Sequence, residues 1–272
     1  MIKQAIIPLA GLGTRMLPLS SVIPKELLPI NGKPNLEYIM EECLEAGIKE
    51  FIFIISKEKI NIKKYFFNDI FYKKIIKKKN DKRIINEFRK LKKYQKMIKF
   101  VYQNKPKGTG DAVLKCKRYI KNNFFLILLP DDLIINKNCT KEMIKLHQTT
   151  KSSIIATKTV NKKNVSRWGI LSVKNKKKNY FQIKDVIEKP SINHAPSNFA
   201  IIGRYILSIK IFDEIKNLKA GKGGEIHITD AIKNLIHKGE KFFANIFKGK
   251  YLDCGTLSGY IESSIQIFKG NK

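Results

Sequence analysis

Short apolar runs rich in β-branched residues recur through the first 160 residues, and their length and composition predict buried strands. The runs are KQAIIPL (3–9), FIFIIS (51–56), MIKFVYQ (97–103), FFLILLP (124–130) and SSIIATKTV (152–160). Stretches with helical periodicity separate them, over residues 35–46, 110–120 and 141–149. This alternation predicts an α/β fold with a mostly parallel sheet and helices on both of its faces.

Two regions depart from that rhythm. Residues 58–97 are rich in Lys and aromatic residues and have helical periodicity, which predicts a helical insertion with a solvated face. After residue 160 the pattern predicts a hairpin (167–175 with 180–190), a strand (198–208), a helix within 223–240, a strand pair (241–255) and a last helix. No linker or repeat interrupts the chain, so we expect one domain over residues 1–272, with halves 1–160 and 161–272.

The formal net charge is +31, with 54 Lys and Arg against 23 Asp and Glu. A value this large is typical of proteins that bind nucleic acid. The excess is nearly all Lys, however, and it is spread along the chain without interleaved Arg and aromatic residues, alongside many Ile and Asn, as AT-rich genomes encode. We therefore expect no specific nucleic-acid partner. A basic arm over residues 58–97 that binds nucleic acid is the less favoured alternative. The positive net charge should also help to recruit an anionic substrate.

The cysteines and the hydropathy indicate a cytoplasmic protein. Cys43, Cys116, Cys139 and Cys254 form no CxxC pair, and the four His residues complete no zinc spacing, so we expect reduced core thiols. No run approaches the ~18 apolar residues that a membrane span needs. The first residues contain no small-residue cleavage site of a signal peptide, and we expect no membrane association.

The turn LAGLGTRMLP (9–18) follows the first predicted strand, where glycine-rich turns commonly bind phosphate. The dinucleotide fingerprint needs a third glycine where this chain has Met16, and the Walker A pattern is absent. G-x-G-T-R remains, followed by IPKELLPINGKP (23–34). The backbone N–H groups at Gly11 and Gly13, with the cations of Arg15 and Lys25, suit a polyphosphate.

Further blocks accompany this pattern, namely QNKPKGTGDAVL, LLPDD, VIEKP, APSNFAIIGRYILS, GGEIHITDAI and YLDCGT. Together they resemble the sugar-phosphate nucleotidyltransferase family, and within it the bacterial uridylyltransferase branch, from about residue 3 to about residue 262. The resemblance implies a Rossmann-like, mixed sheet of the nucleotide-diphospho-sugar transferase type. It also implies a nucleotide-binding half (1–160), a sugar-binding half (161–272) and a homo-oligomer, dimer or tetramer.

The reaction that the resemblance implies is transfer of a uridylyl group from UTP to glucose 1-phosphate, with Mg²⁺ as cofactor. A related activity on dTTP or another sugar 1-phosphate stays open, as does a non-catalytic nucleotide-binding protein. On the nucleotide side, the resemblance implies catalytic roles for Arg15 and Lys25 and binding roles for Leu9, Ala10, Gly11, Gly13, Thr14, Gln103 and Gly108. A Gln amide pairs with uracil, but the flipped amide pairs with cytosine, so Gln103 alone leaves the base open. Asp111 stands where relatives often carry His.

The remaining site residues are expected from the same resemblance. Asp131 and Asp253 are the implied metal ligands, and Asp132 is the less favoured neighbour. Gly169, Glu188 and Lys189 are implied on the sugar-phosphate side. Arg204 is open between phosphate binding and a structural ion pair, and Glu225 between sugar contact and helix start. Glu26 is expected to be structural, and Thr229 and Asp230 to start a helix.

Overall fold

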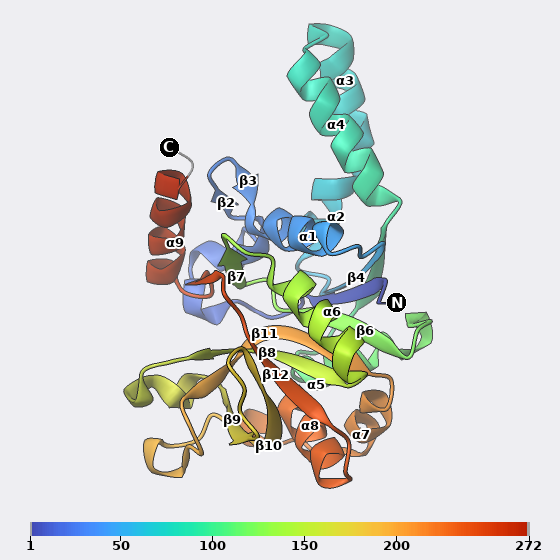
Figure 1. Ribbon diagram of the computed structural model, residues 1–272. Coiled ribbons are helices and arrows are strands. Elements are labelled where there is room, and N and C mark those ends of the chain that lie inside the picture. Colours follow the sequence, from blue (N-terminus) through green and yellow to red (C-terminus); the bar gives the residue numbers. More distant parts are fainter. Residues whose placement is uncertain (1, 271–272) are drawn as a thin grey trace.

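A computed structural model describes the chain from residue 2 to residue 270, and its centre is one nine-stranded sheet (Figure 1). In spatial order the strands are β5 (Ile98–Tyr102), β4 (Glu50–Ile55), β1 (Gln4–Pro8), β6 (Phe124–Leu128), β11 (Phe199–Ser208), β8 (Ser153–Thr159), β12 (Phe242–Ile246), β10 (Tyr180–Glu188) and β9 (Gly169–Lys174). Strands β11 and β10 run opposite to the others. The mixed, mostly parallel sheet is as the sequence predicts.

Strand alternation divides the core between the two faces of the sheet. In β1, Ala5 and Ile7 pack on one face and Ile6 on the other. The first face is covered by α1 (Asn35–Glu45), α2 (Ile60–Phe67), α4 (Lys82–Gln95) and α6 (Cys139–Thr150). The second is covered by α5 (Thr109–Leu114), α7 (Ile211–Asn217) and α8 (Ile228–His237). Helices on both faces explain why the central strands are apolar throughout.

Helix ends follow local sequence signals. Helix α1 begins directly after Pro34, and Gly47, at φ +87°, ends the turn that follows it. Helix α6 begins after Asn138, whose side-chain oxygen accepts a hydrogen bond from the Lys141 N–H at 2.9 Å. The helix expected over residues 110–120 is shorter than predicted. Helix α5 ends at Leu114, and a 3-10 turn over Lys117–Tyr119 follows.

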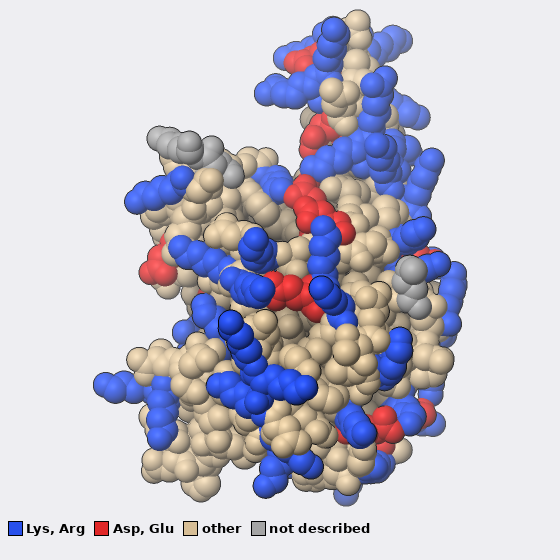
Figure 2. Space-filling view, in the orientation of Figure 1, with Lys and Arg blue, Asp and Glu red and all other residues tan. Residues whose placement is uncertain are grey.

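The insertion before β5 forms a helical arm, defined here as α2, α3 (Asp69–Lys79) and α4, of which α3 and the start of α4 project from the body (Figure 1). Lys92 and Gln95 of α4 bind the Asp69 carboxylate at 2.8 and 2.7 Å. The rings of Tyr72 and Phe88 stack with centroids 5.5 Å apart. On the face shown in Figure 2, Lys and Arg side chains crowd the arm and are scattered over the body.

The strand pair expected over residues 241–255 is wrong. Strand β12 lies inside the main sheet, parallel to β8, whereas β13 (Lys250–Asp253) pairs with β7 (Asp132–Ile135). The apolar side chains of β12 fill both faces between β8 and β10, so this strand gains more burial there than in a hairpin with β13. The predicted hairpin of β9 and β10 is present.

Smaller elements complete the description. Strands β2 (Pro29–Ile30) and β3 (Lys33–Pro34) form a short ribbon, and α9 (Leu257–Gly270) ends the described chain. All four cysteines are buried and unpaired, as expected for core thiols. No helix between residues 2 and 270 has the length and apolar character to cross a membrane.

Candidate active site

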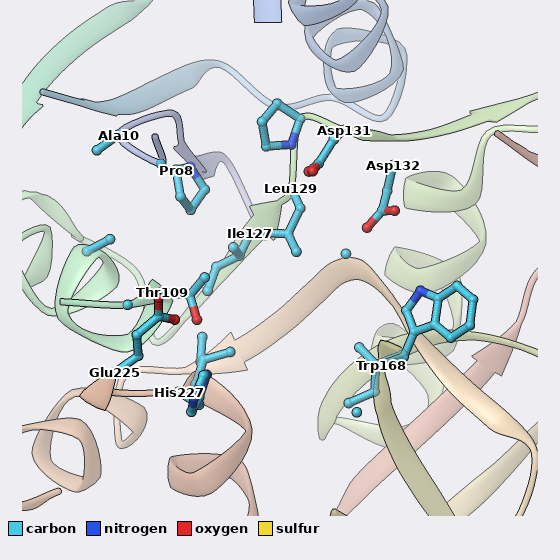
Figure 3. A pocket seen from close by; sticks show the side chains of 18 of the residues that line it. Pro8, Ala10, Thr109, Ile127, Leu129, Asp131, Asp132, Trp168, Glu225 and His227 are labelled. Carbon is cyan, nitrogen blue, oxygen red and sulfur yellow. The ribbon is translucent and has the colours of Figure 1, made fainter. Parts of the chain in front are cut away.

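A cavity of about 530 Å³ opens at the carboxyl ends of the parallel strands β1 and β6, beside the reversed strand β11. Figure 3 shows Pro8 and Ala10 entering it from the end of β1, with Leu129, Asp131 and Asp132 from the chain after β6. Side chains from the segment before α8 and from the start of β9 close the opposite side. Ligands of open α/β sheets bind at such edges, where strand order or direction changes.

The predicted site residues, which are scattered from residue 9 to residue 253, nearly all line this one cavity. Those that line it are Ala10, Gly11, Gly13, Thr14, Arg15, Lys25, Gln103, Gly108, Asp131, Gly169, Glu188, Lys189 and Asp253. Leu9 is the exception, because its side chain is fully buried in the core and its N–H donates to the Ile54 carbonyl at 2.7 Å. Its carbonyl oxygen is the group left for the predicted backbone contact.

The backbone of the glycine-rich turn requires glycine at residue 13. Gly13 adopts φ +69° and precedes a 3-10 turn over Thr14–Met16. A side chain at Gly13 would also crowd Ser20, whose hydroxyl donates to the Gly13 carbonyl at 2.9 Å. Met16 is buried, so the position that is a close-packing glycine in dinucleotide sites here fills the core.

Two cations of this region meet one carboxylate. Lys25 Nζ lies 2.6 Å from Asp131 Oδ2, and Arg15 Nη2 lies 3.5 Å from the same oxygen. Burial by itself lowers the pKa of Lys25, but the Asp131 and Glu26 carboxylates outweigh it and raise that pKa above its usual value. Burial raises the pKa of Asp131, and Lys25 outweighs it and lowers that pKa. Lys25 is therefore a fixed positive charge at neutral pH.

The two predicted metal ligands converge above Gly255. A Cβ atom at Gly255 would lie 2.8 Å from Asp131 Oδ2, 3.0 Å from Arg15 Nη2 and 3.1 Å from Asp253 Oδ1, so both carboxylate oxygens and the Arg15 guanidinium border one small space that only glycine leaves open. The Asp253 Oδ2 atom pairs with Arg167 Nη2 at 2.8 Å. Two converging carboxylates fit Mg²⁺, which commonly takes one or two carboxylates together with substrate phosphates. Within residues 2–270 no cluster of three or more His, Cys, Asp or Glu is gathered for a metal.

Asp132, the less favoured neighbour in the sequence, also lines the cavity (Figure 3). It begins β7 and pairs in register with Asp253 of β13. The Tyr251 hydroxyl donates to its Oδ1 at 2.7 Å. Burial and the nearby Asp131 carboxylate raise the pKa of Asp132 to about 6.

Gln103, at the end of β5, is held on the nucleotide side of the cavity. Its side-chain nitrogen donates to the Asp111 carboxylate at 2.7 Å and to the Gly108 carbonyl at 3.2 Å. Gly108 adopts φ +96°, and a Cβ there would lie 2.6 Å from the Ile226 carbonyl oxygen. The close approach of the two backbones therefore requires glycine at this position.

The predicted sugar-phosphate residues meet at the start of β9 and the end of β10. Gly169 and Glu188 are cross-strand partners, and a Cβ at Gly169 would lie 3.2 Å from Glu188 Oε2. That oxygen accepts a hydrogen bond from the Thr229 hydroxyl at 2.8 Å. Lys189 has φ +44°, its N–H donates to the Trp168 carbonyl at 3.1 Å, and its Nζ lies 3.6 Å from Glu188 Oε1.

Comparison with known proteins identifies the fold and the family. The family model described as "Nucleotidyl transferase" matches residues 4–270. The chain belongs to the nucleotidyl transferase family. Its motif resemblance and its predicted α/β fold are thereby confirmed.

Close relatives of this nucleotidyl transferase cover nearly the whole chain. A putative UTP–glucose-1-phosphate uridylyltransferase of Methanocaldococcus jannaschii is 37% identical, over 98% of this chain and 93% of its own. A UTP–glucose-1-phosphate uridylyltransferase of Staphylococcus saprophyticus is 37% identical, over 98% and 92%. A solved UDP-glucose pyrophosphorylase complexed with UDP-glucose is 37% identical at a TM-score of 0.87, covering 99% of this chain and all of that one.

Several alternatives that the sequence leaves open are decided by the structure of this nucleotidyl transferase. Arg204 is fully buried and pairs with Glu42 at 2.7 Å, so it is a structural ion pair and does not line the cavity. Glu26, expected to be structural, is buried and binds Lys59 Nζ at 2.8 Å, and it also lines the cavity. Thr229 and Asp230 lie in the first turn of α8, as expected for residues that start a helix, and the Thr229 hydroxyl also binds Glu188. Glu225 lines the cavity.

Other residues of the nucleotidyl transferase site were not singled out from the sequence. Arg167, Gly203, Tyr251 and Gly255 all border the cavity or its carboxylates. A Cβ at Gly203 would overlap the Asp132 carboxylate, which explains a glycine in the middle of β11. Gly203, Tyr251 and Gly255 lie within blocks that carry the family resemblance, so the available signal was the block and not the single residue. Arg167 lies outside these blocks and had no such signal.

Proposed function

We propose that the chain transfers the uridylyl group of UTP to glucose 1-phosphate, giving UDP-glucose and pyrophosphate. A phosphate oxygen of glucose 1-phosphate attacks the α-phosphorus of UTP, the α–β phosphate bond breaks in line, and pyrophosphate leaves with the bonding electrons. The observation that carries the proposal is the placement of Lys25 and Asp131 on one side of a single cavity and Glu188 and Lys189 on the other. The names of the relatives support the choice of substrates.

On the nucleotide side, the turn over Gly11, Gly13 and Thr14 would bind the triphosphate through its backbone, with Ala10 and Gly108 beside the base. Lys25 and Arg15 would stabilise the negative charge that develops as the α–β bond breaks. Lys25 suits this because Asp131 and its buried position hold the ammonium in one place.

Asp131 and Asp253 would hold Mg²⁺ at the space above Gly255. When bound there, Mg²⁺ would supply positive charge to the phosphate oxygens and help to align them. The protein's own part is to keep both carboxylates converged, which Lys25 and Arg167 do through their ion pairs.

On the sugar side, the Glu188 carboxylate would accept hydrogen bonds from glucose hydroxyls, and Lys189 would bind the sugar phosphate. Thr229 orients Glu188, and the absence of a side chain at Gly169 leaves room for the sugar beside it. The division into a nucleotide half (1–160) and a sugar half (161–272) follows from this assignment. The four unpaired buried thiols support a cytoplasmic location.

The proposal is tested by pyrophosphate release with Mg²⁺, crossing UTP, dTTP, CTP and ATP against glucose 1-phosphate and galactose 1-phosphate. We expect release with UTP and glucose 1-phosphate above all other pairs. Preference for dTTP would move the chain to the thymidylyl reaction with the same residues. No release with any pair, from protein shown to be folded, would reject the enzymatic proposal in favour of a nucleotide-binding protein.

A further inference from the structure

The amide of Gln103 has a defined orientation in this chain. Its nitrogen faces two acceptors, the Gly108 carbonyl at 3.2 Å and the Asp111 carboxylate at 2.7 Å. A primary amide carries two N–H donors on nitrogen and an acceptor on oxygen, whereas a carbonyl and an ionised carboxylate only accept. The flipped amide would place oxygen against two oxygens. The chemistry of the neighbours therefore fixes the orientation, independently of how N and O are assigned.

Both acceptors are themselves held in place. Gly108 belongs to a turn that is hydrogen-bonded to the segment before α8, where the Ile226 N–H donates to the Lys107 carbonyl at 2.8 Å and the Gly110 N–H to the Ile226 carbonyl at 2.8 Å. Asp111 lies in the first turn of α5, and Lys115 Nζ one turn later lies 3.8 Å from its Oδ1. The oxygen that binds Gln103 is the other one, Oδ2.

This arrangement leaves Gln103 one hydrogen-bonding atom for a ligand. Gln103 lines the cavity at the end of β5, and no described residue donates to its side-chain oxygen Oε1. An acceptor in that position pairs with a ring N–H. Uracil presents N3–H to this oxygen, whereas a cytosine in the same pose presents its acceptor N3 and is repelled, and it would have to shift to offer its N4 amino group instead. Thymine shares N3–H, and Gln103 cannot separate it from uracil.

We propose that Asp111 is a positioning residue that makes Gln103 an acceptor only, and so selects pyrimidine nucleotides with N3–H over cytosine nucleotides. The proposal rests on the proposed function, because it concerns the base accepted by that same cavity. It also removes the ambiguity of a free Gln amide, which by rotation pairs with either base.

Direct binding of UTP and of CTP, each with Mg²⁺, tests the proposal by calorimetry without requiring turnover. In Asp111→Asn the new side chain can donate as well as accept, so the Gln103 amide can turn. We expect the preference for UTP over CTP to fall about tenfold, the loss of roughly one hydrogen bond's discrimination, chiefly through tighter CTP binding. Asp111→Glu keeps an acceptor-only group and should restore much of the preference. Lys77→Ala, which removes an exposed Lys of the helical arm, is the control and should keep the preference.

The coupling of the two residues is the decisive comparison. If Asp111 acts through Gln103, then Asp111→Asn should change the preference no further in a Gln103→Ala background. Three results would overturn the proposal. The preference for UTP over CTP could be unchanged in Asp111→Asn, or Asp111→Asn could reduce it equally in the Gln103→Ala background. The unchanged protein could also show no preference for UTP. If UTP is preferred as described but no pyrophosphate is released with glucose 1-phosphate, the proposed reaction fails and the assignment of Asp111 stands.

Discussion

Lys25 Nζ and Asp131 Oδ2 lie 2.6 Å apart, and this contact joins the loop after β1 to the loop after β6. The two strands are parallel neighbours, so their carboxyl ends lie at the same edge of the sheet. A proposed phosphate-binding cation and a proposed metal ligand are thereby held together before substrate arrives. Such preorganisation is what charge stabilisation in a transition state requires.

Lys25→Ala should lower kcat by about 10²–10³-fold, with a smaller effect on KM for UTP, because its contact is expected to strengthen as charge develops. Steady-state kinetics of pyrophosphate release measures both constants. Lys77→Ala, which removes an exposed Lys of the arm, is the control and should leave both unchanged. A rise in KM for UTP without loss of kcat would show that Lys25 serves ground-state binding only.

Asp131→Asn and Asp253→Asn should each reduce turnover by about 10²-fold or more, because each removes a charge from the proposed Mg²⁺ site. Removal of divalent metal by a chelator should abolish turnover of the unchanged protein, and added Mg²⁺ should restore it. Circular dichroism should report an intact fold in both variants. Full turnover by the unchanged protein in chelator would contradict the assignment of the two carboxylates.

Gly255→Ala should weaken the response to Mg²⁺, because the new Cβ would lie 2.8 Å from Asp131 Oδ2 and 3.1 Å from Asp253 Oδ1. Displacement of catalytic groups by about 1 Å commonly costs ~10²-fold in rate. The activity should be titrated with Mg²⁺ in this variant and in Gly270→Ala, where a Cβ meets nothing within 4 Å. Identical Mg²⁺ curves for both variants would argue against a metal at this point.

Lys59→Met should destabilise the fold by about 3–5 kcal/mol, because it leaves the carboxylate of Glu26, which is 2% exposed, buried without its partner. Urea unfolding measures the loss. The double variant Lys59→Met with Glu26→Leu removes both charges and should recover most of the stability. If the single variant is as stable as the unchanged protein, this ion pair contributes little.

The expected homo-oligomer has a candidate surface on α9. Leu257, Ile261 and Ile265 are about half exposed at helical spacing, and the helix contains one acidic and one basic residue in a chain of net charge +31. Like-charged copies approach most easily where charge is low. Ile261→Lys should therefore lower the mass measured by light scattering to that of a monomer, whereas Lys77→Ala should not. A monomeric unchanged protein would contradict the expectation.

Local patterns were sufficient for most of the fold. Apolar runs of strand length predicted β1, β4, β5, β6 and β8, and Gly47 predicted the end of α1. Each of these features is determined by residues that are neighbours in the sequence. The pairing of strands that are far apart in the sequence could not be predicted in this way. Strand β13 pairs with β7, more than a hundred residues earlier, and β7 has four residues and begins with a charged one, so neither its presence nor its partner has a local signature.

The site divides in the same way. The glycine-rich turn with Arg15 and Lys25 carries a recognisable phosphate pattern in consecutive residues. Asp131 lies close to Asp253 because β7 pairs with β13. The sequence alone did not predict this pairing, so the two residues were expected to share a metal only from the family resemblance. Periodicity also could not decide Arg204, because its complete burial depends on Glu42, a partner in a distant helix.

The buried, ion-paired setting of Lys25 makes it unlike most other amines of the chain. A raised pKa keeps Lys25 protonated, and a protonated amine is not a nucleophile, while its side chain is only 13% exposed. Acylating reagents should therefore label the exposed lysines of the arm and body long before they reach Lys25. Light acylation should therefore leave Lys25 unmodified, whereas Lys189, whose side chain is 44% exposed, should react early and lose its proposed contact with the sugar phosphate.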